Sequence, residues 1–474
     1  MKVRNPRTGE CDYEIASLGE HAVADVASRL RGGQSDWAAL TVEQRGDLLL
    51  RWAETIEARV DDIAEALTLD TGRRGISKIE VLGISGLIRR WAGSAADIIA
   101  DHSPSGSPTA QPTITTTIRL VPYPLVGVIS PWNFPLTLAL IDAIPALMAG
   151  CVVLVKPSEV TPRFIRPLAE TIAEVPELAA VLAVIEGDGT TGAAMVETVD
   201  YICFTGSVAT GRKVGEAAAR AFIPASLELG GKDPMIVLAS AEPEKAAETA
   251  LRASIVNTGQ ACQSIERVYV ARAIAEPFIA ALTEKAKAVR LNHPDIDSGD
   301  IGPFIFEKQA AIVQTQIDDA VAKGATLLAG GTVENLDGGL YLRPTVLSDV
   351  TPDMAIIAEE TFGPVVPVTI FDNVEEAVAL ANGGIYGLSA AVIAGTVAEA
   401  ERVAVRLKAG GVSINDGSLT SMVWEAEKSS FGLSGLGASR MGESGLLRFF
   451  RRQALICQEG EAAPMAAYAE ENFR

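Results

Sequence analysis

Histidine is scarce in this chain of 474 residues. Only His21, His102 and His293 occur, far apart and without the paired spacing of a metal-binding helix. The cysteines number five, an odd count, and none form a Cys-x-x-Cys pair, so the sequence indicates neither a disulfide framework nor a zinc site. We therefore expect no catalytic metal and a cytoplasmic location.

Long apolar runs and positive charge are also in short supply. The N-terminal sequence MKVRNPRTGE has no apolar segment of the signal-peptide type. The most apolar region, residues 120–157, is broken by several prolines and by Asp142, which makes it a poor membrane span. The net charge of -20 repels nucleic acid and anionic lipid. We expect neither a membrane nor nucleic acid as a partner.

The chain is nevertheless rich in apolar residues, which make up 48% of it and predict a globular protein too long for one core. Residues 41–100 show helical periodicity, and residues 101–113 have the composition of a linker or surface loop. From residue 123 onward, short runs rich in valine and isoleucine alternate with alanine-rich stretches, which predicts parallel sheets with crossover helices. A second such series begins near residue 231, so we expect two domains with a cleft between them.

Two strand-like segments fall outside these series. Residues 115–120 alternate β-branched and polar side chains, and the late segment LLRFFRRQALICQ also reads as a strand. We expect the two segments to pair as a protruding flap used for oligomerisation.

Two motifs carry candidate reactive groups. Cys262, in NTGQACQSIERVYV, follows a turn of small residues that would let a substrate and backbone amides approach its sulfur. Glu228, in ASLELGGKDPMIVL, precedes a glycine pair and an apolar strand, a position that suits a general base in a cleft. Taken singly, the cysteine is more often an inert buried thiol, and the glutamate is more often a solvated or salt-bridged carboxylate.

Two further motifs carry polar groups at strand ends. Asn133 stands between Trp132 and Phe134 and between two prolines, where its amide could donate to an oxyanion or simply form a turn. Lys156 and Glu159 follow a strand directly, where they could grip ribose hydroxyls or form a surface ion pair.

A loose glycine-rich signal occurs in YICFTGSVATGRKVGEAAARAF. A strand is followed by the turn Thr205-Gly206-Ser207 and then by a helix opening with small residues. Backbone amides and the helix dipole at such a point would attract a pyrophosphate, although the segment is not the G-x-G-x-x-G fingerprint.

As a set, these motifs resemble the aldehyde dehydrogenase superfamily from about residue 20 to about residue 455. The matching motifs, in order, are PWNFP, KPSE, FTGS, ELGGK, GQAC, EETFGPV and SGLGASRMG. The resemblance implies an α/β fold with a Rossmann-like NAD-binding domain, an α/β catalytic domain and a small β oligomerisation flap. The expected ranges are 1–112 and 123–230 for the NAD-binding domain, 113–122 for the first flap strand, 231–433 for the catalytic domain, and 434–474 for the C-terminal return segment and oligomerisation strand.

The resemblance also implies roles for individual residues. Cys262 matches the nucleophile, Glu228 the general base, and Asn133 the side-chain half of an oxyanion hole whose other half is the Cys262 backbone amide. The cofactor-binding matches are Lys156 and Glu159 at the adenosine ribose, Trp132, Gly206 and Ser207 near the pyrophosphate, and Glu360 and Phe362 at the nicotinamide ribose and ring.

The implied reaction is the NAD(P)-dependent oxidation of a small aldehyde to a carboxylic acid through a cysteine thiohemiacetal and thioester, in a homodimer or homotetramer. A carboxylate at Glu159 would accept the ribose diol and repel a 2'-phosphate, which favours NAD and leaves NADP open. Relatives that pass the acyl group to coenzyme A generally lack the glutamate found here at position 228, so a free acid is favoured.

Three alternatives stay open at this point. The chain could be a coenzyme A-acylating semialdehyde dehydrogenase, a family member without catalysis, or a cysteine hydrolase that would need a histidine to activate its thiol. The substrate is also open, because no cation lies between Ser418 and Trp424, and this favours an apolar or aromatic aldehyde. Arg440 departs from the family pattern, since it stands near a position usually held by an acid, after one extra residue.

Overall fold

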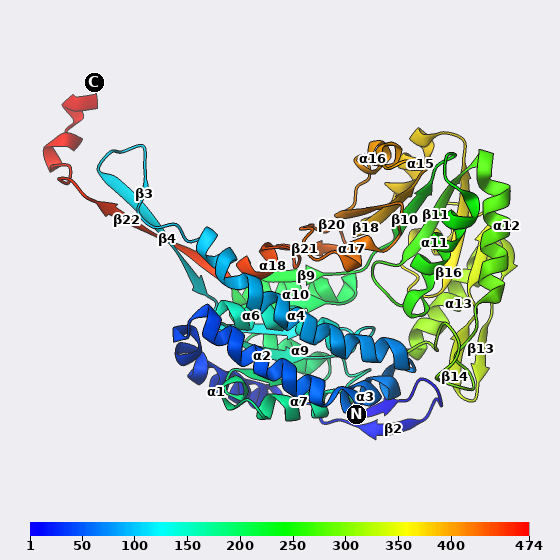
Figure 1. Cartoon of the computed structure of the whole chain (residues 1–474), viewed down its shortest axis with the longest axis horizontal. Coiled ribbons are helices and arrows are strands. Elements are labelled where there is room, and N and C mark those ends of the chain that lie inside the picture. The colour runs from blue at the N-terminus through cyan, green and yellow to red at the C-terminus, as the bar shows by residue number, and fades with distance from the viewer. Residues whose placement is uncertain (474) are drawn as a thin grey trace.

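The computed structural model describes residues 1–473 and contains two large sheets, one three-stranded sheet and three two-stranded sheets (Figure 1). The first large sheet has six strands in the order β21-β9-β8-β5-β6-β7. All neighbours in it are parallel except β21 and β9. The strands are β5 (Leu125–Ile129), β6 (Val152–Lys156), β7 (Leu182–Val184), β8 (Tyr201–Thr205), β9 (Ala225–Glu228) and β21 (Gly435–Leu436).

The first sheet is buried on both faces, as its valine-rich strands predict. Every residue of β5, β6 and β8 is buried, because crossover helices cover a parallel sheet from both sides. The helical periodicity predicted for residues 41–100 is confirmed by α2, α3 and α4. The helices of this part are α1 (Glu20–Ala39), α2 (Val42–Ala58), α3 (Val60–Thr71), α4 (Arg74–Asp101), α5 (Pro135–Leu140), α6 (Ala143–Ala149), α7 (Ile165–Ala173), α8 (Pro176–Ala179), α9 (Gly189–Val196) and α10 (Val208–Ala221).

The second large sheet has seven strands in the order β12-β15-β16-β11-β10-β18-β19. Only β12 and β15 are antiparallel neighbours. Its strands are β10 (Asp233–Val237), β11 (Ile265–Ala271), β12 (Thr326–Ala329), β15 (Thr345–Ser348), β16 (Val365–Phe371), β18 (Ser389–Ile393) and β19 (Gly411–Ile414). Its main helices are α11 (Pro243–Ile255), α12 (Arg272–Ala288), α13 (Glu307–Ala322), α15 (Val374–Ala381) and α16 (Val397–Ala404).

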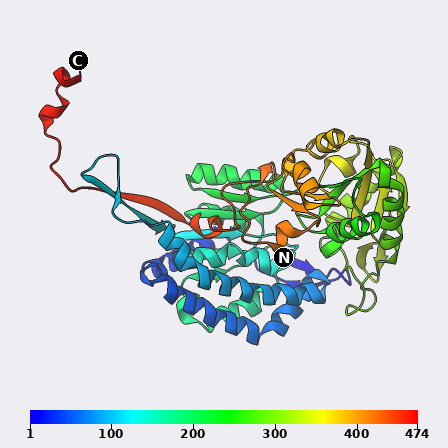
Figure 2. The ribbon, with the colours of Figure 1, turned by 45° about the horizontal axis from the view of Figure 1, so that its top comes forward.

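A narrow three-stranded sheet projects from the body of the molecule (Figures 1 and 2). It consists of β3 (Ser107–Pro108), β4 (Ile114–Pro122) and β22 (Phe450–Gln458). The antiparallel pairing runs from Phe450 opposite Pro122 to Gln458 opposite Ile114, so the pairing predicted between these two segments is confirmed. Almost all of β22 is exposed.

The chain passes between the two large sheets in two places that matter for the site. It leaves the first sheet after β9 and enters the second at β10, and it returns to the first sheet at β21. Cys262 lies between a short 3-10 turn, η1 (Val256–Gly259), and β11. Residues from both sheets therefore meet near the carboxyl ends of β8 and β9. No helix within residues 1–473 is both long and apolar enough to cross a membrane.

Candidate active site

One cavity of about 580 Å³, open to solvent, contains most of the residues predicted for the site. All of the predicted residues line it except Lys156 and Glu159. The lining residues are Pro131, Trp132, Asn133, Leu138, Thr205, Gly206, Ser207, Glu228, Leu229, Gly230, Cys262, Gln309, Glu360 and Phe362. Motifs more than 200 residues apart in the sequence therefore converge on one space.

A tight backbone turn presents Cys262 to this cavity. Asn257, Thr258 and Gly259 all have positive φ, and a Cβ on Gly259 would lie 2.2 Å from the carbonyl oxygen of Gly363, so only glycine fits there. The Gln260 side chain fixes the turn, because its Nε2 donates to the Asn257 carbonyl at 3.1 Å and its Oε1 accepts from the backbone of Ile305 at 2.9 Å. These contacts explain the G-Q pair ahead of the cysteine.

Burial determines the state of the Cys262 thiol. It raises the pKa of Cys262 to about 12, and the nearby carboxylates of Asp233 and Glu228 act in the same direction. Arg440 opposes them. In the protein alone, Cys262 is therefore a protonated thiol at neutral pH, and a base must take its proton when it reacts.

Asn133 is buried, and hydrogen bonds hold both its side-chain amide and its backbone carbonyl. Its Nδ2 donates to the carbonyl of Gln260 at 3.0 Å, two residues before Cys262. Its own carbonyl accepts from Arg73 Nη2 and from Asn257 Nδ2, each at 3.0 Å. The amide is thus pre-positioned beside the cysteine turn, as a donor to a developing oxyanion must be.

Glu228 is the last residue of β9, and its side chain is 21% exposed. The glycines that follow it are required by close approaches. A Cβ on Gly230 would lie 2.6 Å from the Glu360 carboxylate, and one on Gly231 would lie 2.6 Å from the Cys262 carbonyl. The glycine pair therefore lets the general-base candidate, the cysteine turn and Glu360 pack around one point.

The opposite wall of the cavity carries Glu360 and Phe362. The backbone N–H of Gly231 donates to Glu360 Oε1 at 3.1 Å, and burial together with Glu266 raises the pKa of Glu360 to about 8. Phe362 has a positive φ and packs edge-on against Trp132, with 5.4 Å between ring centroids. The aromatic pair closes one side of the cavity.

A buried ion pair that the sequence did not reveal supports this wall. Lys232 Nζ donates to Glu266 at 2.8 Å and to Thr361 Oγ1 at 2.7 Å, and the Glu266 carboxylate accepts from the backbone of Thr361 and Phe362. The lysine of ELGGK thus fixes the segment between Glu360 and Phe362. A lysine directly before a fully buried strand was the only signal in the sequence.

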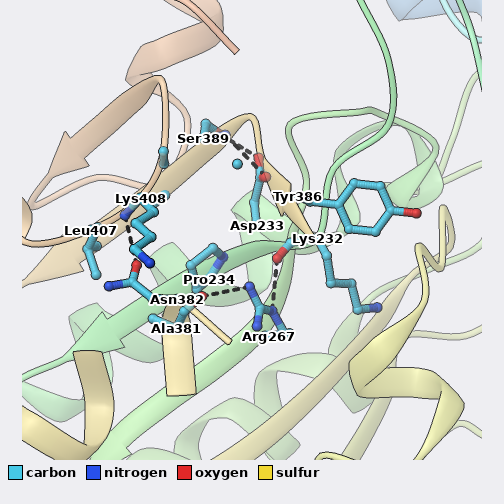
Figure 3. A pocket seen from close by; sticks show the side chains of 13 residues that line it. Lys232, Asp233, Pro234, Arg267, Ala381, Asn382, Tyr386, Ser389, Leu407 and Lys408 are labelled. Atoms are coloured by element: carbon cyan, nitrogen blue, oxygen red, sulfur yellow. Dashed lines mark hydrogen bonds between the residues drawn. The ribbon is translucent and has the colours of Figure 1, made fainter. Parts of the chain in front are cut away.

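Figure 3 shows a smaller cavity that Lys232 borders, lined mainly by β10, β18 and the segment after α15. Asp233 accepts from the backbone and hydroxyl of Ser389, and burial raises the pKa of Asp233 to about 7. Arg267 Nε donates to the Lys232 carbonyl at 2.8 Å. We interpret this cluster as support for the turn between β9 and β10.

Lys156 and Glu159 lie at the end of β6, outside the cysteine cavity. Lys156 Nζ donates to the carbonyls of Pro157 at 2.9 Å and Gly187 at 2.7 Å, and burial lowers the pKa of Lys156. The Glu159 side chain is 39% exposed and lies 3.5 Å from Lys156 Nζ. The Lys156 ammonium is already hydrogen-bonded to backbone carbonyls, so Glu159 is the group more accessible to a ligand.

These positions fit a nicotinamide dinucleotide. Ser207 caps α10 by accepting from the backbone of Thr210, so free N–H groups of a 14-residue helix point toward the carboxyl edge of the sheet. The side chains of Glu159 and Glu360 could accept hydrogen bonds from the hydroxyls of a sugar. The donor set therefore has the chemistry of a diphosphate flanked by two sugars.

Arg440 was singled out from the sequence as a departure from the family pattern, but the residues that it contacts near Glu228 were not. Arg440 Nη2 donates to Asp142 Oδ2 at 2.9 Å and to Thr205 Oγ1 at 2.6 Å, and Arg448 also donates to Asp142. Spacing alone gives no signal for this set, because its members are up to 306 residues apart.

Lys428, four residues after Trp424, was also not predicted from the sequence. Its Nζ donates to Gln263 Oε1 at 3.2 Å and to the Thr420 carbonyl at 2.6 Å. Burial lowers the pKa of Lys428, and the carboxylate of Glu228 opposes that effect. A cation therefore lies beside the residue that follows Cys262.

A fold with two α/β sheets and a thiol, an amide and a carboxylate at a dinucleotide-type sheet edge defines a thiol-dependent oxidoreductase. The chain belongs to the aldehyde dehydrogenase family, whose sequence model matches residues 1–455. Members of this family are oxidoreductases that act on aldehydes with NAD(P), and this is the activity of the chain.

Two relatives and two solved structures illustrate the match. A Mycolicibacterium smegmatis protein provisionally named succinate-semialdehyde dehydrogenase [NADP(+)] is 38% identical, covering 93% of this chain and 86% of its own. A Cereibacter sphaeroides betaine aldehyde dehydrogenase is 37% identical, covering 91% and 88%. The structure of an Anabaena variabilis protein provisionally named aldehyde dehydrogenase PutA superposes with a TM-score of 0.96 at 51% identity, covering 98% and 99%. A Staphylococcus aureus betaine aldehyde dehydrogenase in complex with NAD+ gives 0.90 at 31% identity, covering 98% and 92%.

Proposed function

We propose that the protein oxidises an aldehyde to a free carboxylic acid, with Cys262 as nucleophile, Glu228 as general base and Asn133 as oxyanion donor. The observation that carries this proposal is the convergence of these three side chains on one cavity. The three residues lie far apart in the sequence. Folding alone does not require a thiol, a carboxylate and an amide to line the same cavity.

The first step forms a carbon–sulfur bond. Cys262 Sγ attacks the aldehyde carbon, and the thiol proton leaves to solvent, to which the cavity is open. The aldehyde oxygen takes up the electron pair and is stabilised by Asn133 Nδ2 and the Cys262 backbone N–H. Losing one such donor raises the barrier by about 3 kcal/mol in comparable sites.

A bound dinucleotide would supply the hydride acceptor at its nicotinamide ring. Lys156 and Glu159 would hold the adenosine ribose, Gly206, Ser207 and Trp132 would border the pyrophosphate, and Glu360 and Phe362 would hold the nicotinamide end. Departure of the hydride leaves a thioester on Cys262. Glu228 then removes a proton from a water molecule that attacks the thioester carbon, which releases the acid and the thiol.

NAD is the cofactor we propose, with NADP as the alternative. The Glu159 carboxylate would bond the ribose diol and repel a 2'-phosphate. The named relatives point both ways, because one carries NADP(+) in its name and one solved structure contains NAD+. Comparison of the two cofactors at equal concentration decides between them.

Lys428 favours a second substrate class beside the apolar or aromatic aldehydes expected from the sequence. Its ammonium donates one hydrogen bond to Gln263, the residue after Cys262, and one to the Thr420 carbonyl. Two of its three N–H donors are therefore used. The remaining donor could bind the carboxylate of a short semialdehyde. The provisional name of the Mycolicibacterium relative is consistent with this class.

The flap and the two large sheets suggest the higher organisation. We propose that the sheets mark an NAD-binding domain (residues 1–112 and 123–230) and a catalytic domain (residues 231–433). The flap of β4 and β22 would join subunits of a homodimer or homotetramer. We place the protein in the cytoplasm, in line with its five free cysteines.

Absorbance of the reduced nicotinamide tests the proposed activity. Wild type and Cys262→Ala are assayed with NAD or NADP and with benzaldehyde, hexanal and succinate semialdehyde, and the product is identified with and without coenzyme A. We expect reduction that yields a free acid and disappears in Cys262→Ala, while Cys457→Ala on the exposed flap behaves like wild type. An acyl-coenzyme A product, or activity that survives in Cys262→Ala, would refute the proposal.

A further inference from the structure

A buried cluster of charges next to Glu228 is one negative charge short. Asp142 accepts hydrogen bonds from both Arg440 and Arg448, and all three side chains are at most 11% exposed. Despite the opposing effect of burial, the two guanidinium groups hold the pKa of Asp142 below its usual range. Two positive charges thus face one negative charge in a region with little water to screen them.

Glu228 is placed to supply the missing charge. Arg440 Nε lies 4.0 Å from Glu228 Oε1, and within the described residues this buried Nε has no hydrogen-bond partner. A buried N–H without an acceptor is unfavourable, so a small rotation of Glu228 that brings its carboxylate onto Nε would be stabilising. The cluster of Asp142, Arg440, Arg448 and Glu228 is neutral only when Glu228 is ionised.

The position of Arg440 is fixed independently of Glu228. Its Nη2 bonds to Thr205 as well as to Asp142, and Thr205 lies opposite Glu228 at the ends of β8 and β9. The guanidinium therefore lies across the ends of both strands. Its Nη2 bonds to Thr205 at the end of β8, and its Nε faces Glu228 at the end of β9. Such a brace constrains where the Glu228 carboxylate can lie.

We propose that Arg440 is a positioning residue that keeps Glu228 ionised and directed into the cavity for thioester hydrolysis. The inference rests on the proposed role of Glu228. The other charged or titratable groups acting around Glu228 are Lys428, which also favours the carboxylate, and the thiols of Cys262 and Cys203. Glu360 and Asp233 act on the same Cys262 thiol from the second sheet.

Hydrolysis of p-nitrophenyl acetate tests the role of Arg440 without any cofactor. The ester acetylates the Cys262 sulfur and releases nitrophenol in a burst, and water then cleaves the thioester to acetate and free thiol. The burst reports the nucleophile, and the steady state reports the step that needs ionised Glu228. We compare wild type, Arg440→Gln and Arg440→Lys from pH 5 to 9, following nitrophenol at its isosbestic wavelength.

We expect Arg440→Gln to keep the burst amplitude, while the acidic limb of its steady-state rate moves up by about one pH unit or more. Arg440→Lys keeps the positive charge, so the acidic limb of its steady-state rate should lie close to that of wild type. Arg45→Gln is the matched control, because Arg45 is also largely buried but donates only to backbone carbonyls. It should leave the limb in place.

Two results would overturn the proposal. One is an acidic limb that stays in place in Arg440→Gln, and the other is an equal shift in Arg45→Gln. A wild type that gives no burst would instead refute Cys262 as the proposed nucleophile, so the two failures are distinguishable. Should Arg440→Gln not fold, the limb of Arg440→Lys decides, since loss of the guanidinium geometry alone should shift it by a smaller amount in the same direction.

Discussion

Thr205 and Glu228 lie opposite each other at the last register position shared by the parallel strands β8 and β9. Thr205 belongs to the turn that leads into α10, and Glu228 begins the turn that leads into the second sheet. The dinucleotide end and the hydrolytic end of the proposed site are thus fixed to neighbouring strands. This relationship explains why one cavity contains both groups of residues.

Replacing Glu228 by glutamine should separate the two halves of the reaction. The amide cannot take a proton from water, so turnover should fall by about 10²- to 10⁴-fold. A first equivalent of reduced nicotinamide per site should still form, and intact-protein mass spectrometry should then detect an acyl group on Cys262. Loss of this first equivalent together with turnover would show that Glu228 is needed before the thioester forms.

The raised pKa of Cys262, about 12, predicts slow alkylation of the protein alone. Only the thiolate reacts, so below the pKa the rate of labelling by iodoacetamide should rise about tenfold per pH unit. Peptide mass spectrometry can follow Cys262 beside the exposed Cys11 in the same sample. A rate for Cys262 that levels off below pH 9 would contradict the burial effect.

Asp233 should make folding stability depend on pH. Burial raises the pKa of Asp233 to about 7, so between about pH 4 and 7 the folded state binds this proton and the unfolded state does not. Its contribution to the free energy of unfolding therefore falls as pH rises through this range, by on the order of 1 kcal/mol per pH unit.

Asp233→Asn should accordingly flatten the fall in the free energy of unfolding between pH 5 and 7, measured by chemical denaturation. Asp70, Glu80 and Glu360, whose pKa values are also raised, would leave part of the slope in place. Asp61→Asn, at an 87% exposed side chain, serves as the control. An unchanged slope in Asp233→Asn would mean that Asp233 stays ionised in the fold.

Lys428→Met should distinguish the two proposed substrate classes. Loss of a charge-assisted hydrogen bond to a carboxylate should raise KM for succinate semialdehyde about tenfold or more. KM for benzaldehyde should stay the same or fall, because methionine is apolar. Lys408→Met, in the separate cavity of Figure 3, is the matched control. Equal effects on both aldehydes would assign Lys428 a structural role only.

The sequence by itself determined the α/β fold, the helical opening and the strand character of the segments that form β4 and β22. These follow from periodicity, because a period of 2 or 3.6 residues is a local property that survives without knowledge of the partner strand. The sequence also indicated Cys262, Glu228 and Asn133, since small residues, glycine pairs and prolines mark the close approaches that a reactive side chain needs. The family follows from the order of these motifs.

Only the tertiary structure decided which charges meet. Asp142 and Arg448 are 306 residues apart, and neither stands in a pattern that names its partner. Lys232 likewise reads as an ordinary lysine until Glu266 is seen against it. Electrostatic pairing depends on distance in space and on burial, and neither is encoded in local spacing. The environment of Glu228, including its relation to Arg440, is therefore a property of the folded chain.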